Sequence, residues 1–100
     1  MARRWTIKGD RICERRFWSK RSAGIHDINA ISGICIDKIT YDENFLILHL
    51  DNGRVLEIGE LDDGFADVTR ALAGQLKRFP VDWMAHITEK DSPKTIWTRC

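Results

Sequence analysis

The sequence predicts an α+β domain in which a mostly antiparallel, curved sheet is packed by one main helix. Three observations carry this prediction: several short segments alternate apolar and polar residues, an Asp-Asn-Gly turn at 51–53 separates two apolar runs, and a helical apolar stripe follows directly. A chain of 100 residues with 43% apolar content has the size of one compact domain. We therefore expect a single domain over residues 1–100.

The chain opens with a predicted hairpin. Trp5 and Ile7 alternate with polar residues, Gly9-Asp10 is a turn signal, and residues 11–18 alternate again. Neither side of this second segment is cleanly apolar, so we expect an edge strand, where charged side chains protect unpaired backbone groups. Residues 19–24 are polar and small and are predicted to form a loop.

The isoleucine-rich stretch that follows predicts two short segments. Ile28 and Ile31 fit one helical turn or a short bent strand, whereas residues 34–41 alternate as a strand. Gly33 is the expected bend or bulge between them. Residues 42–44 are predicted to be a turn that leads into the next strand.

Two registers compete for the hairpin around Asp51-Asn52-Gly53. A two-residue Asn-Gly loop sets Leu48 opposite Glu57, whereas a three-residue loop sets Leu48 opposite Leu56 and Leu46 opposite Ile58. The second register keeps apolar residues together, and it needs Gly53 in the left-handed conformation. We therefore predict the three-residue loop, with a bulge at Gly53.

The main helix is predicted at about 63–79. Asp62 or Asp63 offers the N-cap, Leu61 can pack against the first turn, and Pro80 ends the helix near residue 79. Lys77 and Arg78 would then lie in the last turn, where the helix dipole favours cations. The apolar stripe recurs at spacings of three and four residues and consists of Phe65, Val68, Leu72, Leu76 and Phe79.

Two further elements are expected after Pro80. Asp82 is predicted to cap a short helix in which Trp83 and Ile87 lie one turn apart. Residues 94–99 alternate and predict a last strand, with either Ile96 or Trp97 directed inward.

Residues 26–79 resemble the bacterial pleckstrin-homology-like domains. The resemblance rests on consecutive antiparallel strands, an L-x-L-x-x-G-R hairpin at Leu48–Arg54, the I-G-E of residues 58–60 and a D-x-G-F helix start at residues 62–65. It implies a scaffold that is used for binding and seldom for catalysis. The resemblance does not fix a ligand.

Charge is distributed unevenly along the chain. Residues 1–22 hold eight Lys or Arg against two acids, a net of +6, whereas residues 27–67 hold ten acids against two cations, a net of −8. No long apolar run is present and no apolar leader follows the first arginines, so we expect neither a membrane span nor a signal peptide. Three widely spaced cysteines predict reduced thiols, and hence a bacterial-type cytoplasm.

The basic N-terminal segment is a candidate site for nucleic acid or for another anionic surface. Cations would meet phosphates, and Trp5, Phe17 and Trp18 would stack on bases. The alternative is a solvated basic edge without a ligand. The candidate residues are Arg11, Arg15, Arg16, Trp18, Lys20 and Arg21.

An acidic set forms the second candidate site. Turns and caps explain Asp42, Asp51 and either Asp62 or Asp63. Glu57 and Glu60 have no such local role, so a face that docks a basic partner is a second reading. An immunity or inhibitor protein would use such a face. The candidate residues are Glu57, Glu60, Asp63 and Asp67.

No converging set of catalytic side chains is recognisable. The histidines at 26, 49 and 86 stand in three separate segments, and Cys35 lies in an apolar strand, typical of an ordinary buried thiol. No zinc spacing and no phosphate loop is present, so we expect neither a metal nor a cofactor. The chain is predicted to be a non-enzymatic binding module with a protein partner.

That partner is predicted to include a second copy of the chain. Leu46, Leu48 and Leu50 share one face of their strand, while Phe45 and Ile47 point to the other face, which needs a cover. Either the C-terminal tail folds over Phe45 and Ile47, or two copies associate there.

Overall fold

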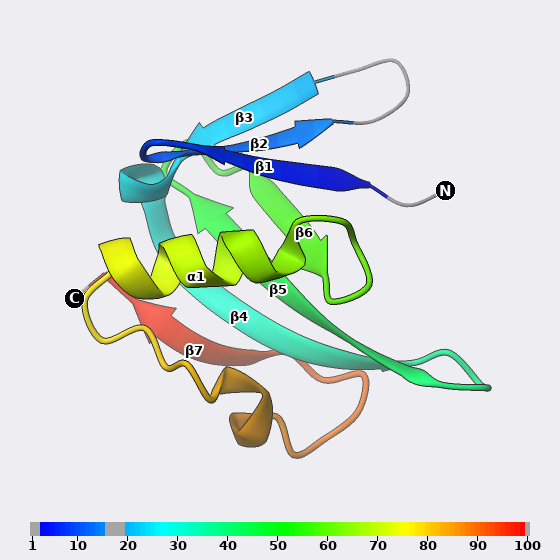
Figure 1. Ribbon diagram of the computed structural model, residues 1–100. Coiled ribbons are helices and arrows are strands. Elements are labelled where there is room, and N and C mark those ends of the chain that lie inside the picture. Colours follow the sequence, from blue (N-terminus) through cyan, green and yellow to red (C-terminus); the bar gives the residue numbers. More distant parts are fainter. Residues whose placement is uncertain (1–2, 16–19, 100) are drawn as a thin grey trace.

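The computed structural model describes residues 3–15 and 20–99 and arranges them as two antiparallel sheets and one α-helix (Figure 1). The N-terminal sheet has the order β1-β2-β3, with strands Arg4–Lys8, Arg11–Arg15 and Lys20–Gly24. The main sheet has the order β6-β5-β4-β7. Its strands, in chain order, are β4 (Ile28–Asp37), β5 (Asp42–Leu50), β6 (Val55–Gly59) and β7 (Lys94–Thr98). The helix is α1 (Phe65–Gln75), and two short 3-10 helices are η1 (Ile25–Asp27) and η2 (Trp83–His86).

This arrangement confirms the predicted fold class. The chain is α+β, both sheets are antiparallel, one main helix packs on them, and a short helix and a final strand follow that helix. No helix in the described part of the chain is both long and apolar enough to cross a membrane.

The opening hairpin is confirmed, but its second strand does not lie at an edge. Gly9, with φ 61°, allows a two-residue turn that pairs Lys8 with Arg11. β2 pairs with β1 on one side and with β3 on the other, so it is the central strand of the sheet. The predicted loop at 19–24 was wrong because residues 20–24 supply that third strand: buried Ala23 lies opposite Ile12, and Lys20 and Ser22 face outward.

The isoleucine-rich stretch forms one continuous strand, β4, instead of two segments. Its pairing with β5 shifts between Ile28 and Ala30, which explains why Ile28 and Ile31 are both buried although they lie three residues apart. Gly33 is not the bend. A Cβ atom there would lie 2.7 Å from Cδ1 of Ile87, so this glycine lets the tail approach the sheet closely.

The turn between β4 and β5 lies earlier than predicted. β5 starts at Asp42, because residues 42–44 pair with residues 35–37, and the chain reverses at 38–41. The backbone N–H of Ile39 donates to Oδ1 of Asp37 at 2.8 Å, and Ile39 itself takes a positive φ of 76°. Asp42, Glu43 and Asn44 therefore belong to a strand.

The β5–β6 hairpin has the predicted three-residue register. Leu48 lies opposite Leu56, and Leu46 lies opposite Ile58. Gly53 has φ 82°, and the backbone N–H of Leu50 donates to the carbonyl of Arg54 at 2.9 Å. The turn residues and the pairing of apolar side chains both favour this register, so the sequence alone predicted it correctly.

The helix is shorter than the predicted 63–79. Gly64 occupies the N-cap position with φ 88°, no side chain caps the helix, and a Cβ at Gly64 would lie 2.0 Å from the Trp5 carbonyl oxygen. The Asp62 carboxylate instead accepts hydrogen bonds from Trp5 and Gly59, which are described below. The helix ends at Gln75, and the extended backbone of Leu76 (φ −105°, ψ 127°) places Lys77 and Arg78 beyond it. Four residues of the predicted apolar stripe are nevertheless buried: Val68 and Leu72 lie on α1, and Leu76 and Phe79 lie in the segment that follows it.

The C-terminal tail covers the same face of the main sheet as α1. Trp83 and Ile87 lie against Gly33, and the Phe65 and Trp83 rings pack with centroids 6.1 Å apart. Trp97, the inward residue of β7, lies opposite Ile31 and donates to the Lys77 carbonyl at 2.8 Å. Asp82 does not cap η2 with its side chain, contrary to the prediction.

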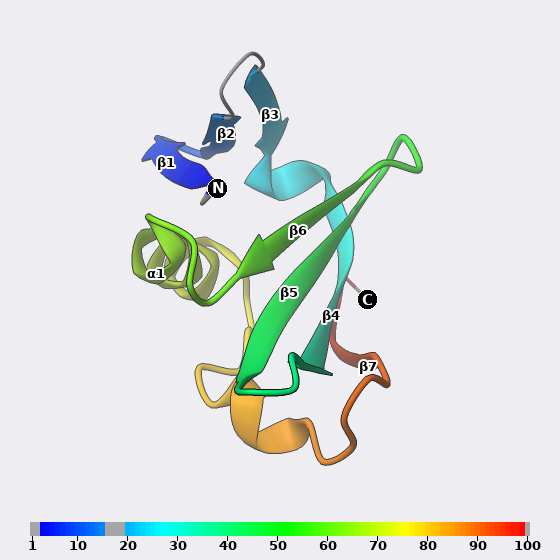
Figure 2. The ribbon, with the colours of Figure 1, turned by 90° about the vertical axis from the view of Figure 1, so that its right-hand side faces the viewer.

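The other face of the main sheet is therefore not covered by the tail. Leu46 and Leu48 are buried beneath α1, whereas Phe45 and Ile47, of opposite parity in β5, are half-buried and lie outside the core. Figure 2 shows α1 on one side of β4, β5 and β6. The sequence predicted either the C-terminal tail or a second copy of the chain as the cover of this face. The described residues of the tail do not cover it.

Candidate functional site

The N-terminal sheet has one buried face and one cationic face. Side chains of alternate residues point to opposite faces, and directly paired residues share a face. The buried face carries two rows, which are Trp5, Glu14 and Arg21, and Ile7, Ile12 and Ala23. The opposite face carries three rows, which are Arg4, Arg15 and Lys20, then Thr6, Cys13 and Ser22, then Lys8, Arg11 and Gly24.

Within the described part of the chain the cations of this face form no ion pairs, although the Asp27 carboxylate lies over Gly24, near Arg11. Its five cations, Arg4, Lys8, Arg11, Arg15 and Lys20, are all exposed. In the described part of the chain, none of them has a carboxylate within ion-pairing distance. The Arg11 guanidinium donates to the neutral Ser22 hydroxyl at 3.1 Å.

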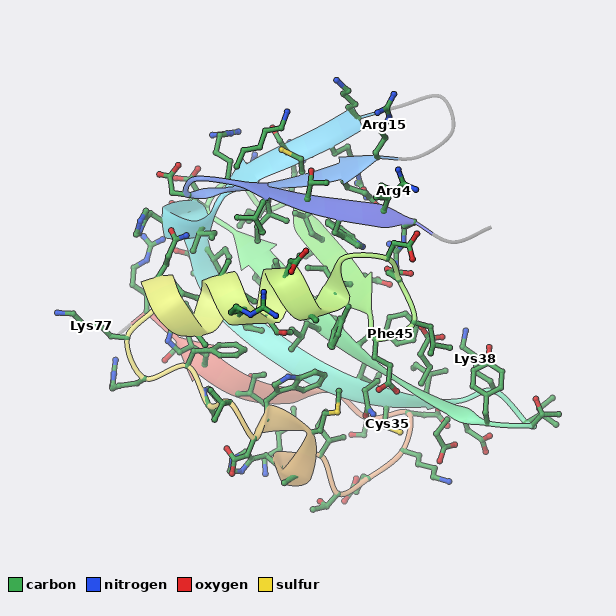
Figure 3. The ribbon with its side chains drawn as sticks, viewed as in Figure 1. Arg4, Arg15, Cys35, Lys38, Phe45 and Lys77 are labelled. Atoms are coloured by element: carbon green, nitrogen blue, oxygen red, sulfur yellow. The ribbon has the colours of Figure 1, made fainter. Side chains whose placement is uncertain are left out.

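Three of the cations form a row at one end of this face. Arg4 lies opposite Arg15, and Arg15 lies opposite Lys20 (Figure 3 shows Arg4 and Arg15 together at that end). Adjacent strands are about 4.8 Å apart, so like charges directly opposite each other raise the free energy of the sheet. An anion bound over the row would relieve that repulsion.

The structure divides the basic residues that the sequence singled out. Arg11, Arg15 and Lys20 lie together on the cationic face. Arg21 lies on the buried face, where its Nε donates to Oε1 of Glu14 at 2.8 Å. Arg16 and Trp18 lie outside the described residues.

Sequence reasoning missed two members of the cationic face, Arg4 and Lys8. Both are exposed. Both point to the same face of the sheet as Arg11 and Arg15, because the turn that pairs Lys8 with Arg11 sets the register of the strands. The signal was present in the two-residue Gly9-Asp10 turn, because that turn fixes which residues of β1 and β2 are paired.

Glu14 explains why two arginines are unavailable to a ligand. Its carboxylate is 1% exposed and accepts from Arg3 at 3.4 Å as well as from Arg21. A buried carboxylate is tolerated only when it is paired, so these guanidiniums have a structural role.

Trp5 is likewise structural and is not free to stack on bases. It is 1% exposed, and its indole Nε1 donates to Oδ2 of Asp62 at 2.9 Å. The same oxygen accepts from the backbone N–H of Gly59 at 3.0 Å and lies 3.3 Å from the Arg3 guanidinium. Asp62 thus ties the N-terminal sheet to the chain before α1, which is why it does not cap the helix. Phe17, like Trp18, lies outside the described residues.

The acidic candidates do not share a surface. Glu57 points to the face of the main sheet opposite α1, whereas Asp67 lies on α1 and pairs with Arg70 at 3.1 Å. Oε1 of Glu60 accepts from the backbone and side-chain nitrogens of Asn44, at 2.8 and 3.1 Å, so this residue does have a local role. Asp63 is exposed in the loop before α1, where its backbone pairs with that of Arg4.

Outside the two candidate sites, His49 and His86 lie in separate places, whereas Cys35 lies near Asp42 and Lys90, which form an ion pair at 3.1 Å. Among the described residues, no group of three or more His, Cys, Asp or Glu side chains is placed to hold a metal ion. His49 shares a 3.2 Å hydrogen bond with Ser32, and exposed His86 lies 3.4 Å from Asp82. Burial raises the pKa of the Cys35 thiol above its ordinary value of 9.0, and the nearby Asp42 carboxylate raises it further.

A hollow of about 570 Å³ lies between α1 and residues 79–85. Phe65, Phe79 and Trp83 contribute to its mainly apolar walls, and Arg70 and Asp82 lie at its border. Both border charges already have partners, since Arg70 pairs with Asp67 and Asp82 lies beside His86. The hollow therefore offers no free charge that would orient a polar ligand.

Comparisons of this chain with protein-family models, with curated proteins and with solved structures find no match. A proposal for its function therefore depends on the chemistry of its own surfaces.

Proposed function

We propose that this protein is a non-enzymatic binding module that holds the phosphate backbone of a nucleic acid on the cationic face of its N-terminal sheet. One observation carries the proposal: five exposed cations share that face, and in the described part of the chain none of them has a carboxylate within ion-pairing distance. Cations that have no partner within the protein retain their full attraction for an external polyanion.

The side chains of this face match what phosphates need. Three of the five cations are arginines, whose guanidinium groups can donate two parallel hydrogen bonds to one phosphate. The hydroxyls of Thr6 and Ser22 lie in the row between the cations and add neutral donors. Arg, Lys, Ser and Thr are the side chains that make most contacts to nucleic-acid phosphates.

The side chains around the five cations favour a nucleic acid over a lipid bilayer as the ligand. A protein that rests on an anionic membrane usually adds apolar side chains that enter the bilayer. In the described part of the cationic face no large apolar side chain accompanies the five cations, since Trp5, Ile7 and Ile12 point to the buried face. No described aromatic ring is available there for stacking, so we expect binding with little sequence preference.

We also propose that the chain is a pleckstrin-homology-like module. The support is the order of its elements: consecutive antiparallel strands precede a helix that packs on the main sheet. The chain continues beyond this helix, and β7 joins the sheet beside β4. A scaffold of this type would be used for binding, in agreement with the proposed role.

The alternative of an immunity or inhibitor protein with an acidic docking face has less support. Its four residues are distributed over β6, α1 and the connection between them, and Glu57 and Asp67 lie on opposite sides of the main sheet. Among the described residues, these four acids therefore form no single patch that could meet a basic partner.

The proposal is tested by fluorescence anisotropy with a labelled oligonucleotide at low salt. The double variant Arg15→Ala, Lys20→Ala removes two members of the cationic row, and we expect it to bind clearly more weakly than the unmodified protein. The matched control is Lys77→Ala, Lys94→Ala, which removes the same charge from exposed positions elsewhere; Lys77 lies well away from Arg15 in Figure 3. The control is expected to bind almost as the unmodified protein does.

Equal weakening by both double variants would show that only net charge matters and would contradict a defined site. Binding to anionic vesicles at the same ionic strength, without binding to the oligonucleotide, would show that the polyanion is a membrane and would refute the nucleic-acid proposal.

A further inference from the structure

The uncovered face of the main sheet carries a patch of apolar side chains, here called the outer patch. Its residues point away from α1 on β4, β5 and β6, and they are Ile34, Ile36, Phe45, Ile47 and Val55. Four of these are half-buried and Val55 is 43% exposed, yet none belongs to the core or packs against it. Apolar side chains gathered outside the core of a small domain indicate an interaction surface.

No described segment of the chain is available to cover the outer patch. α1, η2 and the tail residue Ile87 all pack on the opposite face, as the contacts of Gly33 and the side chain of Asn44 show. Val55 to Glu57 form the sheet edge on one side, and β7 forms the edge on the other. Within the described residues, the outer patch therefore has no cover.

Unpaired charges of both signs border the patch. Nζ of Lys38 lies 5.5 Å from the centroid of the Phe45 ring, at the turn end of β4 and β5 (Figure 3). Glu57 lies opposite Ile47 on the neighbouring strand and is exposed. Neither Lys38 nor Glu57 has an ion-pair partner among the described residues.

A third charge lies at the same end of the patch. Glu43 is only 7% exposed, and its carboxylate lies over Gly59 beside the Phe45 ring. It has no hydrogen-bond or ion-pair partner in the described part of the chain. No described side-chain oxygen is both buried and without a hydrogen bond, so this carboxylate keeps contact with solvent, where a cation of another molecule can reach it.

We propose that the outer patch binds a second copy of this chain through a two-fold interface. A two-fold axis that passes between Phe45 and Ile47 stacks the two apolar patches and brings Lys38 of each copy toward the acids Glu57 and Glu43 of the other. The surface is thus complementary to itself in both apolarity and charge. With a net charge of only +1, two copies approach each other with little overall repulsion.

Sedimentation equilibrium over a wide concentration range tests this proposal. We expect the unmodified protein to pass from monomer to dimer, and Ile47→Arg to raise the dissociation constant by more than about tenfold, because it places a charge in an apolar interface. Ile47 lies outside the core, so the urea unfolding of the monomeric variant should remain close to that of the unmodified protein. The matched control, Val81→Arg, changes an apolar residue that is 80% exposed on the α1 side and should dimerise normally.

The charge arrangement is tested in the same experiment. Lys38→Glu should weaken the dimer, and adding Glu57→Lys to it should restore association. An unmodified protein that remains monomeric at high concentration, or an Ile47→Arg variant that dimerises like the control, would overturn the proposal. A double variant that stays monomeric would overturn the reciprocal pairing of Lys38 and Glu57. The cationic face lies on the other sheet, so these results and those on nucleic-acid binding are independent.

Discussion

Neighbouring residues of β2 have opposite electrostatic roles. The carboxylate of Glu14 is buried and binds the guanidiniums of Arg3 and Arg21, whereas Arg15 points outward and has no carboxylate partner among the described residues. Removing Glu14 would take away the carboxylate that Arg21 binds and one of the two that Arg3 binds, whereas removing Arg15 would leave the fold unchanged. The parity of each residue in the strand thus decides whether its charge stabilises the fold or is available to a ligand.

Cys35 gives the fold a predictable response to alkaline pH. Because burial raises the pKa of its thiol above 9.0, the folded chain keeps a proton that the unfolded chain loses as the pH rises through that value. The free energy of unfolding should therefore fall between about pH 8 and about pH 10. Lys90, whose pKa is raised by its hydrogen bond with Asp42, adds a loss of the same sign at still higher pH.

Urea unfolding of the unmodified protein and of Cys35→Ala at both pH values measures this contribution. We expect the variant to lose less stability on going to alkaline pH, since all other titrating groups are common to both proteins. An equal loss in both proteins would show that the Cys35 thiol does not titrate differently in the folded state.

At the scale of the element, the sequence was most informative where the determinants are local. The β5–β6 hairpin was predicted correctly because Gly53 and the apolar pair Leu48 and Leu56 lie within a few residues of each other. The helix was predicted too long at its start because Asp62, a plausible cap, is instead bound by the distant Trp5. The shift in register that makes β4 one strand depends on β5 and leaves no local signal.

The candidate site shows the same limit. The basic composition of the N-terminal segment identified Arg11, Arg15 and Lys20, but it did not separate them from Arg21, which is committed to Glu14. That separation requires β3, and β3 was not predicted because its polar, small residues have no apolar alternation. The cationic face could be defined only after all three strands were in register.

The packing of α1 on the main sheet is tested by two leucine truncations. Leu72, on α1, is fully buried, and Leu72→Ala should cost about 2–5 kcal/mol of unfolding free energy through lost burial and a cavity. Leu61, in the loop before α1, is 61% exposed, and the same change there should cost less than about 0.5 kcal/mol. Similar small losses for both variants in urea unfolding would show that α1 does not seal the core.

At the scale of the whole molecule, the net charge of +1 conceals two surfaces of different character. The N-terminal sheet presents five exposed cations that form no ion pair among the described residues, and the main sheet presents an apolar patch bordered by charges of both signs. Trp5, Ile12 and Leu72 belong to one hydrophobic core that joins the two sheets. The cationic face and the outer patch therefore lie on different sides of this shared core. One protein of this size can thus bind a polyanion and a second copy of itself at separate places.

The salt dependence of oligonucleotide binding tests the central claim most directly. Each phosphate neutralised by a cation releases a counterion, so the logarithm of the association constant should fall linearly with the logarithm of the salt concentration. If all five cations of the cationic face contact a single strand, the slope should be about −3.5. Replacing Arg15 and Lys20 by alanine should make it shallower by about 1.4. A slope near zero, or one that this double variant leaves unchanged, would contradict the assignment of nucleic-acid binding to this face.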